Sequence, residues 1–530
     1  MINSRNWQNT GVRLPTYDVQ KMVEETRKTP VWLHFGAGNA FRALIAVLQQ
    51  RLLESNYSKV GIIAAETHDT DIIDKVYVPH DNMFLNVILG SDGSLNTELV
   101  ATVAETIAIK PDDISSFERL KEVFCNPSLQ IVSFTITEKG YMLRDANGNL
   151  QASAIKDFED GPGAPCHSIS IVCAMLHKRY QAGRLPLALV SVDNLAKNGD
   201  VLKASIVETA DMWQKSGFVD SGFLKYLRDR SSVSFPLTVI DKITPRPDEA
   251  VAEQLRMRGI SDIEPIVTSK HTHIAPFVNS ERPEYLVIES NFPASRPPLE
   301  KAGVFFTDRE TVSKFERMKV SACLNPLHTS MAVYGCLLGF TRISEMMKDT
   351  DIIKLINRLG YVEGLPVASD PGILSPKVFL DEVINERFPN PFLPDAPQRI
   401  ATDTSQKVGV RFGETVKGYK ELGYDLNNLV SLPLSIAGWL RYLLAVDDEG
   451  GAMEVSPDPL KESLQKELTG IVWNDQASYN GQILGILKNE AIFGSDLTQT
   501  VLGKKIEEMF IFLLSGKGAA RKALKHYLYS

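Results

Sequence analysis

The sequence predicts an α/β fold, in which a doubly wound parallel sheet is followed by a mostly α-helical C-terminal domain. Short apolar runs alternate with helical patterns over the first 300 residues. After a proline-rich segment, Phe292–Pro298, apolar residues recur at helical spacing instead. A chain of 530 residues exceeds the ~100–200 typical of one domain, so we expect domains at residues 1–300 and 301–530.

The first elements form a strand–turn–helix–strand unit, which is how a parallel sheet begins. Residues 30–36 are an apolar run that ends in glycine, residues 39–53 carry apolar side chains at helical spacing, and residues 60–65 are again apolar. Further strands are expected at 130–136, 187–192 and 237–240, and C-terminal helices at 309–319, 329–338, 429–444 and 484–514.

Composition and charge limit the function classes. The net charge of −8 argues against a non-specific binder of nucleic acid or anionic membranes. No apolar run reaches the ~18 residues of a membrane span. The five cysteines are scattered without a C-x-x-C pair, so we expect neither a disulfide framework nor a metal site. Since the N-terminus lacks the apolar core of a signal peptide, we expect a cytoplasmic protein.

A glycine turn between the first strand and the first helix predicts a Rossmann-like nucleotide site. Gly36 would let the backbone turn sharply, and Gly38 would let it approach a pyrophosphate at the helix N-terminus. Asn39, Phe41 and Arg42 open the helix and are further candidate cofactor contacts. Phe41 occupies the third glycine position of the usual fingerprint, so an ordinary tight turn is the competing interpretation.

The end of the second strand bears on the choice of cofactor. Glu66 lies there, thirty residues after Gly36. A carboxylate at this place accepts hydrogen bonds from ribose hydroxyls and repels a 2′-phosphate, so we expect NAD and not NADP. The alternative is a solvated glutamate at a strand end.

Polar residues also follow the later strands, where an open α/β sheet binds ligands. Any one of them could be turn chemistry, because Asn, Asp and Gly favour turns. Their recurrence after successive predicted strands favours a ligand site. The candidates are Thr137 and Glu138, Asn194 and Asn198, and Asp241.

The segment with the most pronounced catalytic character is FERMKVSACLNPLHTS. A desolvated Lys319 would have its pKa lowered from ~10.4 toward neutrality and could act as a base. Asn325 could donate a hydrogen bond to a developing alkoxide, and His328 could orient the lysine or bind a hydroxyl. Composition alone favours the alternative, a helix with a snorkelling lysine and a satisfied core histidine.

Taken together, the motifs resemble the mannitol dehydrogenase and fructuronate reductase family, the polyol-specific long-chain, zinc-independent dehydrogenases. The matching stretches are HFGAGNAFRA, FTITEKGY, SVDNLAKNGD, VIDKITP, YLVIESNFPASRPPLEKAGV, KVSACLNPLH and RIATDTSQK. The resemblance covers roughly Val31 to Lys420 and, more loosely, the C-terminal helices. It implies an NAD-dependent enzyme acting on a CH–OH group of a sugar acid or polyol.

The resemblance also implies catalytic roles. Lys319 matches the general base of the family. Asn325 and His328 match its substrate and alkoxide contacts. Glu316 matches an acidic residue implicated in releasing the proton to solvent.

Other matches concern substrate binding. Asn198 or Asn194 matches an asparagine that supports the reacting oxygen, and Asp241 matches a further polar contact. In the helical domain, Arg399 and Lys407 match two substrate-binding cations.

Two departures from the family pattern bear on the substrate. Thr402 stands where mannitol enzymes usually have histidine, and the nucleotide turn reads N-A-F-R-A-L where the usual form ends R-A-H. Because a guanidinium suits bidentate binding of a carboxylate, we expect reduction of a keto-hexuronate such as D-fructuronate to D-mannonate. A mannitol or other polyol 2-dehydrogenase and a non-catalytic dinucleotide-binding regulator are the alternatives. We expect a monomer or a small homo-oligomer.

The spacing around Lys319 predicts an irregular backbone. Asn325 is six residues after Lys319, one more than the family spacing, and His328 is nine after it. At ~100° per residue, a regular helix would place Lys319 and His328 on opposite faces. Pro326 also removes one helical N–H. We therefore expect a π-bulge or a break between Val320 and Pro326, with the three side chains converging on one cavity between the domains.

Overall fold

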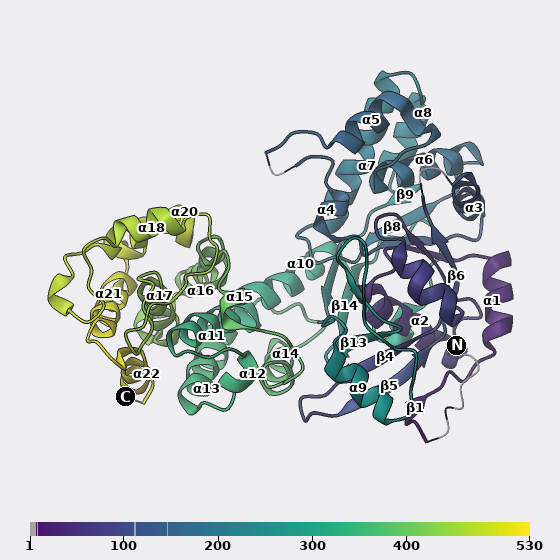
Figure 1. The fold of residues 1–530 in the computed structure, drawn as a ribbon. Coiled ribbons are helices and arrows are strands. Elements are labelled where there is room, and N and C mark those ends of the chain that lie inside the picture. The colour runs from purple at the N-terminus through teal and green to yellow at the C-terminus, as the bar shows by residue number, and fades with distance from the viewer. Residues whose placement is uncertain (1–6, 8, 111–112, 146, 530) are drawn as a thin grey trace. The chain divides into compact units, whose positions relative to one another are not determined.

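The computed structural model describes residues 7, 9–110, 113–145 and 147–529. It divides into two compact units, Met1–Gly90 with Ser94–Val312, and Ser91–Gly93 with Ser313–Ser530. The first unit, purple to teal in Figure 1, combines sheets with helices, and the second, green to yellow, is helical. The predicted fold class, an α/β part followed by a mostly helical part, is confirmed.

The first unit is built on a six-stranded parallel sheet with the order β6-β3-β2-β7-β8-β9. In chain order this is 3-2-1-4-5-6, the arrangement of a Rossmann fold. The order reverses between β2 and β7, the place where such sheets bind ligands. The strands are β2 (Trp32–Phe35), β3 (Ile62–Glu66), β6 (Val103–Ala108), β7 (Ile131–Phe134), β8 (Leu187–Ser191) and β9 (Val233–Ser234).

Helices cover both faces of this sheet, and successive side chains of β2 show why. Leu33 and Phe35 enter the core on one face, while Trp32 enters the core on the other, because side chains alternate along a strand. The first core includes residues of α3 (Ile114–Cys125), α6 (Ser168–Gln181), α7 (Asn198–Lys215) and α8 (Ser221–Arg228); the second includes residues of η2 (Phe41–Ile45) and α2 (Ala46–Glu54).

Among the described residues, three smaller sheets complete the first unit, the shortest being β11 (Ile266–Val267) with β12 (His273–Ile274). One of the others corrects a prediction. The apolar run 237–240 forms β10 (Thr238–Asp241), which pairs antiparallel with β14 (Tyr285–Glu289) and is no strand of the parallel sheet. A four-stranded sheet of order β1-β5-β4-β13 was not predicted at all. Its strands are β1 (Val12–Arg13), β4 (Phe84–Leu89), β5 (Leu95–Val100) and β13 (Phe277–Glu281).

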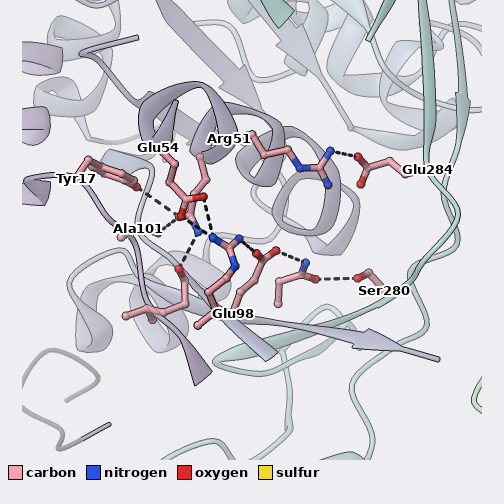
Figure 2. Close-up of polar contacts among 11 residues, drawn as sticks. Tyr17, Arg51, Glu54, Glu98, Ala101, Ser280 and Glu284 are labelled. Carbon is pink, nitrogen blue, oxygen red and sulfur yellow. Dashed lines mark hydrogen bonds and ion pairs between the residues drawn. The ribbon is translucent and has the colours of Figure 1, made fainter. Parts of the chain in front are cut away.

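A polar network ties the four-stranded sheet together (Figure 2). Asn86 on β4 donates to Glu98 on β5 at 2.8 Å and accepts from Ser280 on β13 at 2.9 Å. Arg51 of α2 forms an ion pair with Glu284 at 2.6 Å. The helix that follows the glycine turn is thus fixed to chain segments more than 200 residues away.

The proline-rich segment Phe292–Pro298 lies inside the first unit. After it, β15 (Phe305–Thr307) still pairs with β14. The boundary between the units falls within α10 (Arg309–Met318), after Val312.

The second unit consists of packed helices. Buried helix α11 (Asn325–Leu337) packs against α15 (Pro397–Ile400) and α17 (Ser431–Tyr442), and α17 packs against α21 (Val501–Leu513). The single helix expected at 484–514 is wrong. The chain there forms α19 (Ile483–Lys488) and α20 (Glu490–Phe493), and Gly494, with a positive φ of 75°, ends the second of them before α21 begins.

Candidate active site

A cavity of about 460 Å³ opens in the first unit at the point where the order of the parallel sheet reverses. This volume is within the ~300–1,000 Å³ of small-molecule and cofactor sites. The cavity is lined by Gly36, Gly38, Glu66, Thr67, His68, Asp69, Ile72, Thr135, Ile136, Thr137, Lys139, Gly140, Gln151, Ser153, Cys166, His167, Ser168, Thr272 and Ile274.

The two positions of the turn require glycine for different structural reasons. Gly36 has a φ of +100°, and a Cβ there would lie 2.2 Å from the carbonyl oxygen of Thr135. A side chain would thus clash with the neighbouring strand end. At Gly38, a Cβ would meet no atom within 4 Å, so its missing side chain leaves open space in the cavity. The first glycine shapes the turn and the second keeps the approach clear, as a pyrophosphate requires.

Glu66 lies at the end of β3 and on the cavity wall, at the predicted place. Its Oε2 accepts from the backbone N–H of Ala37 at 2.9 Å, inside the glycine turn. Its Oε1 accepts from Thr67 and His68 at 3.0 and 2.9 Å. Backbone donors therefore hold this carboxylate against the turn, where a ribose next to the pyrophosphate would lie.

Four of the predicted cofactor contacts line this cavity, namely Gly36, Gly38, Glu66 and Thr137, and four others do not. Phe41 is fully buried and stacks on His34, with ring centroids 4.3 Å apart. Arg42 is also fully buried and donates to Ala275 O at 2.6 Å and to Asn39 Oδ1 at 2.7 Å. Arg42 and Asn39 thus brace the start of the helix, and Glu138 is exposed.

Several lining residues were not predicted. Thr135 directly follows β7 and could have been found from the rule that ligands meet strand ends. Thr137, which was predicted, has a positive φ of 63° that the sequence did not indicate, because this conformation is unfavourable for a β-branched residue. Cys166 and His167 directly precede α6 and Ser168 is its first residue, and no local pattern links them to the glycine turn.

The two asparagines after β8 are not equivalent. Asn198 is 1% exposed, and its Nδ2 donates to Asp193 O and to both oxygens of Thr238 at 2.8–3.1 Å. Its Oδ1 accepts from Gly199 N and Thr238 N. Asn198 is therefore a structural tie between β8 and β10 and has no amide hydrogen left for a substrate. Asn194 is exposed, and Asp241 is buried at the end of β10.

In the second unit, the predicted irregularity near Lys319 is confirmed. Residues Lys319–Cys323 form a π-helical turn, η7, in which Leu324 N donates to Lys319 O at 3.2 Å. Leu324 then breaks the helix with φ −125° and ψ −63°. Pro326 becomes the second residue of α11, where no helical partner requires its missing N–H. Lys319 and Glu316, at the end of α10, are both half-buried.

Helix α11 presents the other two candidates on one face. Asn325 and His328 are three residues apart and half-buried, and Thr329 lies beside them at i+4 from Asn325. Two further segments pack on this region: α15, which carries Arg399, and η12 (Gly409–Gly413), which packs against both α11 and η7.

Asp395 lies between two predicted residues, Arg399 and His328, and was not predicted from the sequence. Its Oδ1 accepts from Nη2 of Arg399, and its Oδ2 lies 3.6 Å from Nε2 of His328. Burial lowers the pKa of His328 to about 4; Asp395 opposes this, and neighbouring arginines, among them Arg411, reinforce it. The imidazole is therefore neutral at physiological pH.

Positive charge gathers at Lys407 and Arg411, where Arg411 N donates to Lys407 O at 2.9 Å. Lys407 donates from Nζ to the backbone oxygen of Thr402 at 2.5 Å, so the residue at the usual histidine position is bonded to a predicted substrate-binding cation. Burial and the charge of Arg411 lower the pKa of Lys407. Arg411, from η12, donates to Thr329 Oγ1 on α11. Anionic ligands would be favoured in such surroundings.

Within the described ranges, no group of three or more His, Cys, Asp and Glu side chains is arranged to hold a metal ion. No helix among these residues has the length and apolar character needed to cross a membrane.

The first unit has a Rossmann sheet with a glycine turn where the strand order reverses. The helical unit carries a lysine, an asparagine and a histidine on irregular helices. Together these features define a dehydrogenase-type oxidoreductase. The chain belongs to the mannitol dehydrogenase family. The mannitol dehydrogenase Rossmann domain matches residues 31–301, and the mannitol dehydrogenase C-terminal domain matches residues 311–510.

Individual relatives agree with this family. D-mannonate oxidoreductase of Thermotoga maritima is 48% identical over 98% of this chain and 96% of its own. D-mannonate oxidoreductase of Escherichia coli is 29% identical over 93% of both chains, and mannitol 2-dehydrogenase of Aspergillus fumigatus is 28% identical over 94% of this chain and 93% of its own. These names make the chain an enzyme that acts on CH–OH groups.

Solved structures share the fold over nearly the full length. D-sorbitol dehydrogenase in substrate-free form has a TM-score of 0.76 at 23% identity and covers 98% of this chain and 97% of its own. Pseudomonas fluorescens mannitol 2-dehydrogenase, in a ternary complex with NAD and D-mannitol, has a TM-score of 0.67 at the same identity and coverage.

Proposed function

We propose that this enzyme is an NAD-dependent oxidoreductase that reduces a keto-hexuronate such as D-fructuronate to D-mannonate, in a reversible reaction. The observation that carries the substrate assignment is the cluster of positive charge in the second unit: Arg399 and Arg411 act on His328, and Arg411 also acts on Lys407. A hexuronate brings a carboxylate that these cations can bind, whereas a neutral polyol does not. The 48% identity to a D-mannonate oxidoreductase supports the same choice.

The cavity of the first unit is the proposed NAD site. Its residues fit the cofactor, because Gly36 and Gly38 leave a clear approach at a helix N-terminus and Glu66 lies beside them for the ribose. NAD, when bound, supplies the acceptor or donor of the hydride. The buried carboxylate of Glu66 disfavours a 2′-phosphate, which is the physical basis for NAD over NADP.

Proton transfer is assigned to the second unit. Lys319 in its amine form takes the proton from the substrate hydroxyl during oxidation and returns it during reduction. Asn325 donates a hydrogen bond to the same oxygen, and neutral His328 binds a substrate hydroxyl. Glu316, near the end of α10, passes the proton to solvent.

The remaining assignments concern the substrate. Of the two asparagines after β8, Asn194 is proposed to support the reacting oxygen, since the amide of Asn198 is fully used within the fold. Asp241 provides a further polar contact. Arg399 and Lys407 hold the end of the substrate away from the hydride, with Thr402 beside Lys407.

Two alternative functions can be distinguished from the proposed one, the first by the charge of the preferred substrate and the second by the absence of turnover. A polyol 2-dehydrogenase is favoured by the relatives named mannitol 2-dehydrogenase, and it would prefer neutral substrates. A dinucleotide-binding regulator would bind NADH without turnover.

We further propose a cytoplasmic protein with domains at residues 1–300 and 301–530, acting as a monomer or small homo-oligomer without nucleic-acid or membrane partners. The five free cysteines suit a reducing compartment.

The test is an NADH-coupled assay of the purified enzyme over matched substrates. The panel holds D-fructuronate and other keto-hexuronates, and the neutral ketose D-fructose with its polyol mannitol. We expect kcat/KM for a hexuronate to exceed that for the neutral sugars by at least about 100-fold, the scale of a bound charge pair. A preference for neutral substrates would assign the polyol alternative, and NADH binding without any turnover would assign the regulator.

A further inference from the structure

Arg411 is a half-buried arginine with little structural use for its charge. Among the described residues, its side chain forms one hydrogen bond, to Thr329 Oγ1, and no ion pair with a carboxylate. A guanidinium carries five N–H donors. Burial lowers the pKa of Arg411 to about 10.

Two other buried arginines, Arg179 and Arg441, use more of their donors within the fold. Arg179, in the first unit, donates five hydrogen bonds to backbone carbonyls. Arg441, in the second unit, donates to the carbonyls of Leu513, Val446 and Asp447. Both hold the fold together through their donors. Because a buried charge without compensation is costly, the sparse bonding of Arg411 calls for a partner outside the chain.

The surroundings of Arg411 show where such a partner would lie. Thr329 is next to His328 and one helical turn beyond Asn325 on α11. The backbone N–H of Arg411 donates to Lys407 O at 2.9 Å, and its side chain bonds to the residue after His328, so Arg411 lies close to both proposed substrate contacts. The η12 segment that carries it also packs on the π turn of Lys319.

Arg399 is less suited to the same task. It is 66% exposed, and Asp395 already pairs with one end of its guanidinium. A carboxylate ligand would have to share Arg399 with this neighbouring acid, which repels it. Arg411 has no acid bound to it in the described chain and lies in less exposed surroundings, where a charge pair is stronger.

We propose that Arg411 is the specificity-determining residue that binds the substrate carboxylate, in bidentate geometry and with Lys407 beside it. This inference rests on the proposed function, because it needs an acidic substrate. Thr329 is then a positioning residue that aims the guanidinium, and Arg399 with Asp395 contributes a weaker outer contact.

The experiment is a double-mutant-type cycle, in which a substitution in the enzyme is combined with removal of the charge from the substrate. The kcat/KM values of wild type, Arg411→Gln and Arg399→Gln are measured with D-fructuronate and with its uncharged primary amide. Wild type should prefer the acid, and Arg411→Gln should lose roughly 100-fold on the acid but only a few-fold on the amide. Arg411→Lys should recover part of the loss, and Arg399→Gln should show the smaller acid-specific loss. Arg342→Gln, at an exposed site, controls for net charge.

A second measurement separates recognition from folding. Since Arg411 is a charge that the fold does not compensate, Arg411→Met should leave the melting temperature unchanged or raise it. Saturating D-mannonate should raise the melting temperature of wild type but not of Arg411→Met. Thr329→Val tests the hydroxyl that holds the guanidinium and should weaken acid turnover by less than Arg411→Gln.

The outcomes are distinct. Equal losses on acid and amide in Arg411→Gln, or a larger acid-specific loss in Arg399→Gln, would overturn the role of Arg411 while leaving hexuronate reduction intact. A fall in the melting temperature of Arg411→Met together with unchanged acid preference would make Arg411 a structural residue. If wild type turns over neutral ketoses and no hexuronate, the proposed function fails first and the carboxylate role fails with it.

Discussion

The candidate sites of the two units are built from different groups, backbone atoms in the first unit and charged side chains in the second. In the cavity of the first unit, backbone groups do the shaping, and Glu66 accepts hydrogen bonds from Ala37, Thr67 and His68. In the second unit, side chains do the shaping; among the described residues, the side chain of Arg411 donates one hydrogen bond, and Nε2 of His328 has no hydrogen-bond partner. A site built from backbone can stay the same while the substrate changes, whereas a site built from side chains changes with single substitutions. This contrast supports the proposal that the first unit holds the cofactor and that the second unit carries the cations that select the substrate.

The largest effect is expected from substitution of Lys319, a side chain of the second unit. Lys319→Ala should reduce kcat by about 10³-fold, within the range for loss of a general acid–base group. The dissociation constant of NADH, measured by fluorescence titration, should change by less than about threefold, because Lys319 acts on the substrate. Near-normal turnover in this variant would remove Lys319 from the mechanism.

The backbone half of the comparison is tested at the glycine turn. Gly36→Ala places a Cβ 2.2 Å from Thr135 O at a φ of +100°, so we expect a loss of stability of about 3 kcal/mol or more and no measurable NADH binding. Gly38→Ala is the matched control, since its Cβ meets no atom within 4 Å. This variant should keep the wild-type melting temperature and bind NADH more weakly. If both variants melt early, Gly38 has a structural role as well.

A smaller effect concerns pH and His328. The unfolded chain takes up a proton at this residue near pH 6.5, and the folded chain only near pH 4. The free energy of unfolding is therefore unaffected above pH 6.5 and falls by up to about 3 kcal/mol as the pH drops to 4. His328→Asn should remove this part of the slope in urea titrations. His34, whose pKa burial lowers to about 3, contributes in the same direction and remains in the variant.

The smallest effect expected is at Glu66. Glu66→Ser should shift the ratio of kcat/KM for NADP to that for NAD by about tenfold toward NADP, because the repulsion of a 2′-phosphate is removed. It should also lower the melting temperature slightly, since three or more backbone N–H groups lose their acceptor. A wild type that already prefers NADP would contradict the assignment of Glu66.

The sequence predicts best what depends on neighbours along the chain. Strands β2, β3, β7 and β8 and the glycine turn were found because each carries a local apolar or glycine pattern. The π turn after Lys319 was also predictable, since spacing and Pro326 conflict with a regular helix.

What depends on distant pairing was not found. The four-stranded sheet joins β13 to β4 across almost 200 residues, and β10 looks like the other apolar strands although it pairs elsewhere. Asp395 and Arg411 reach His328 and Thr329 from some 70–80 residues along the chain. Asn198 appeared as reactive as Asn194, and only its contact with Thr238 shows that its amide is fully used.

The π turn at Lys319–Cys323 has a practical consequence for hybrid enzymes. It stores one residue in a wider turn, so the phase of α11 relative to α10 depends on the length of this segment. A crossover point placed inside 319–325, between two relatives that differ by one residue here, would rotate the following helix by ~100° and carry Asn325 and His328 to another face. Exchanges of substrate specificity should therefore transfer this segment as a whole or leave it untouched.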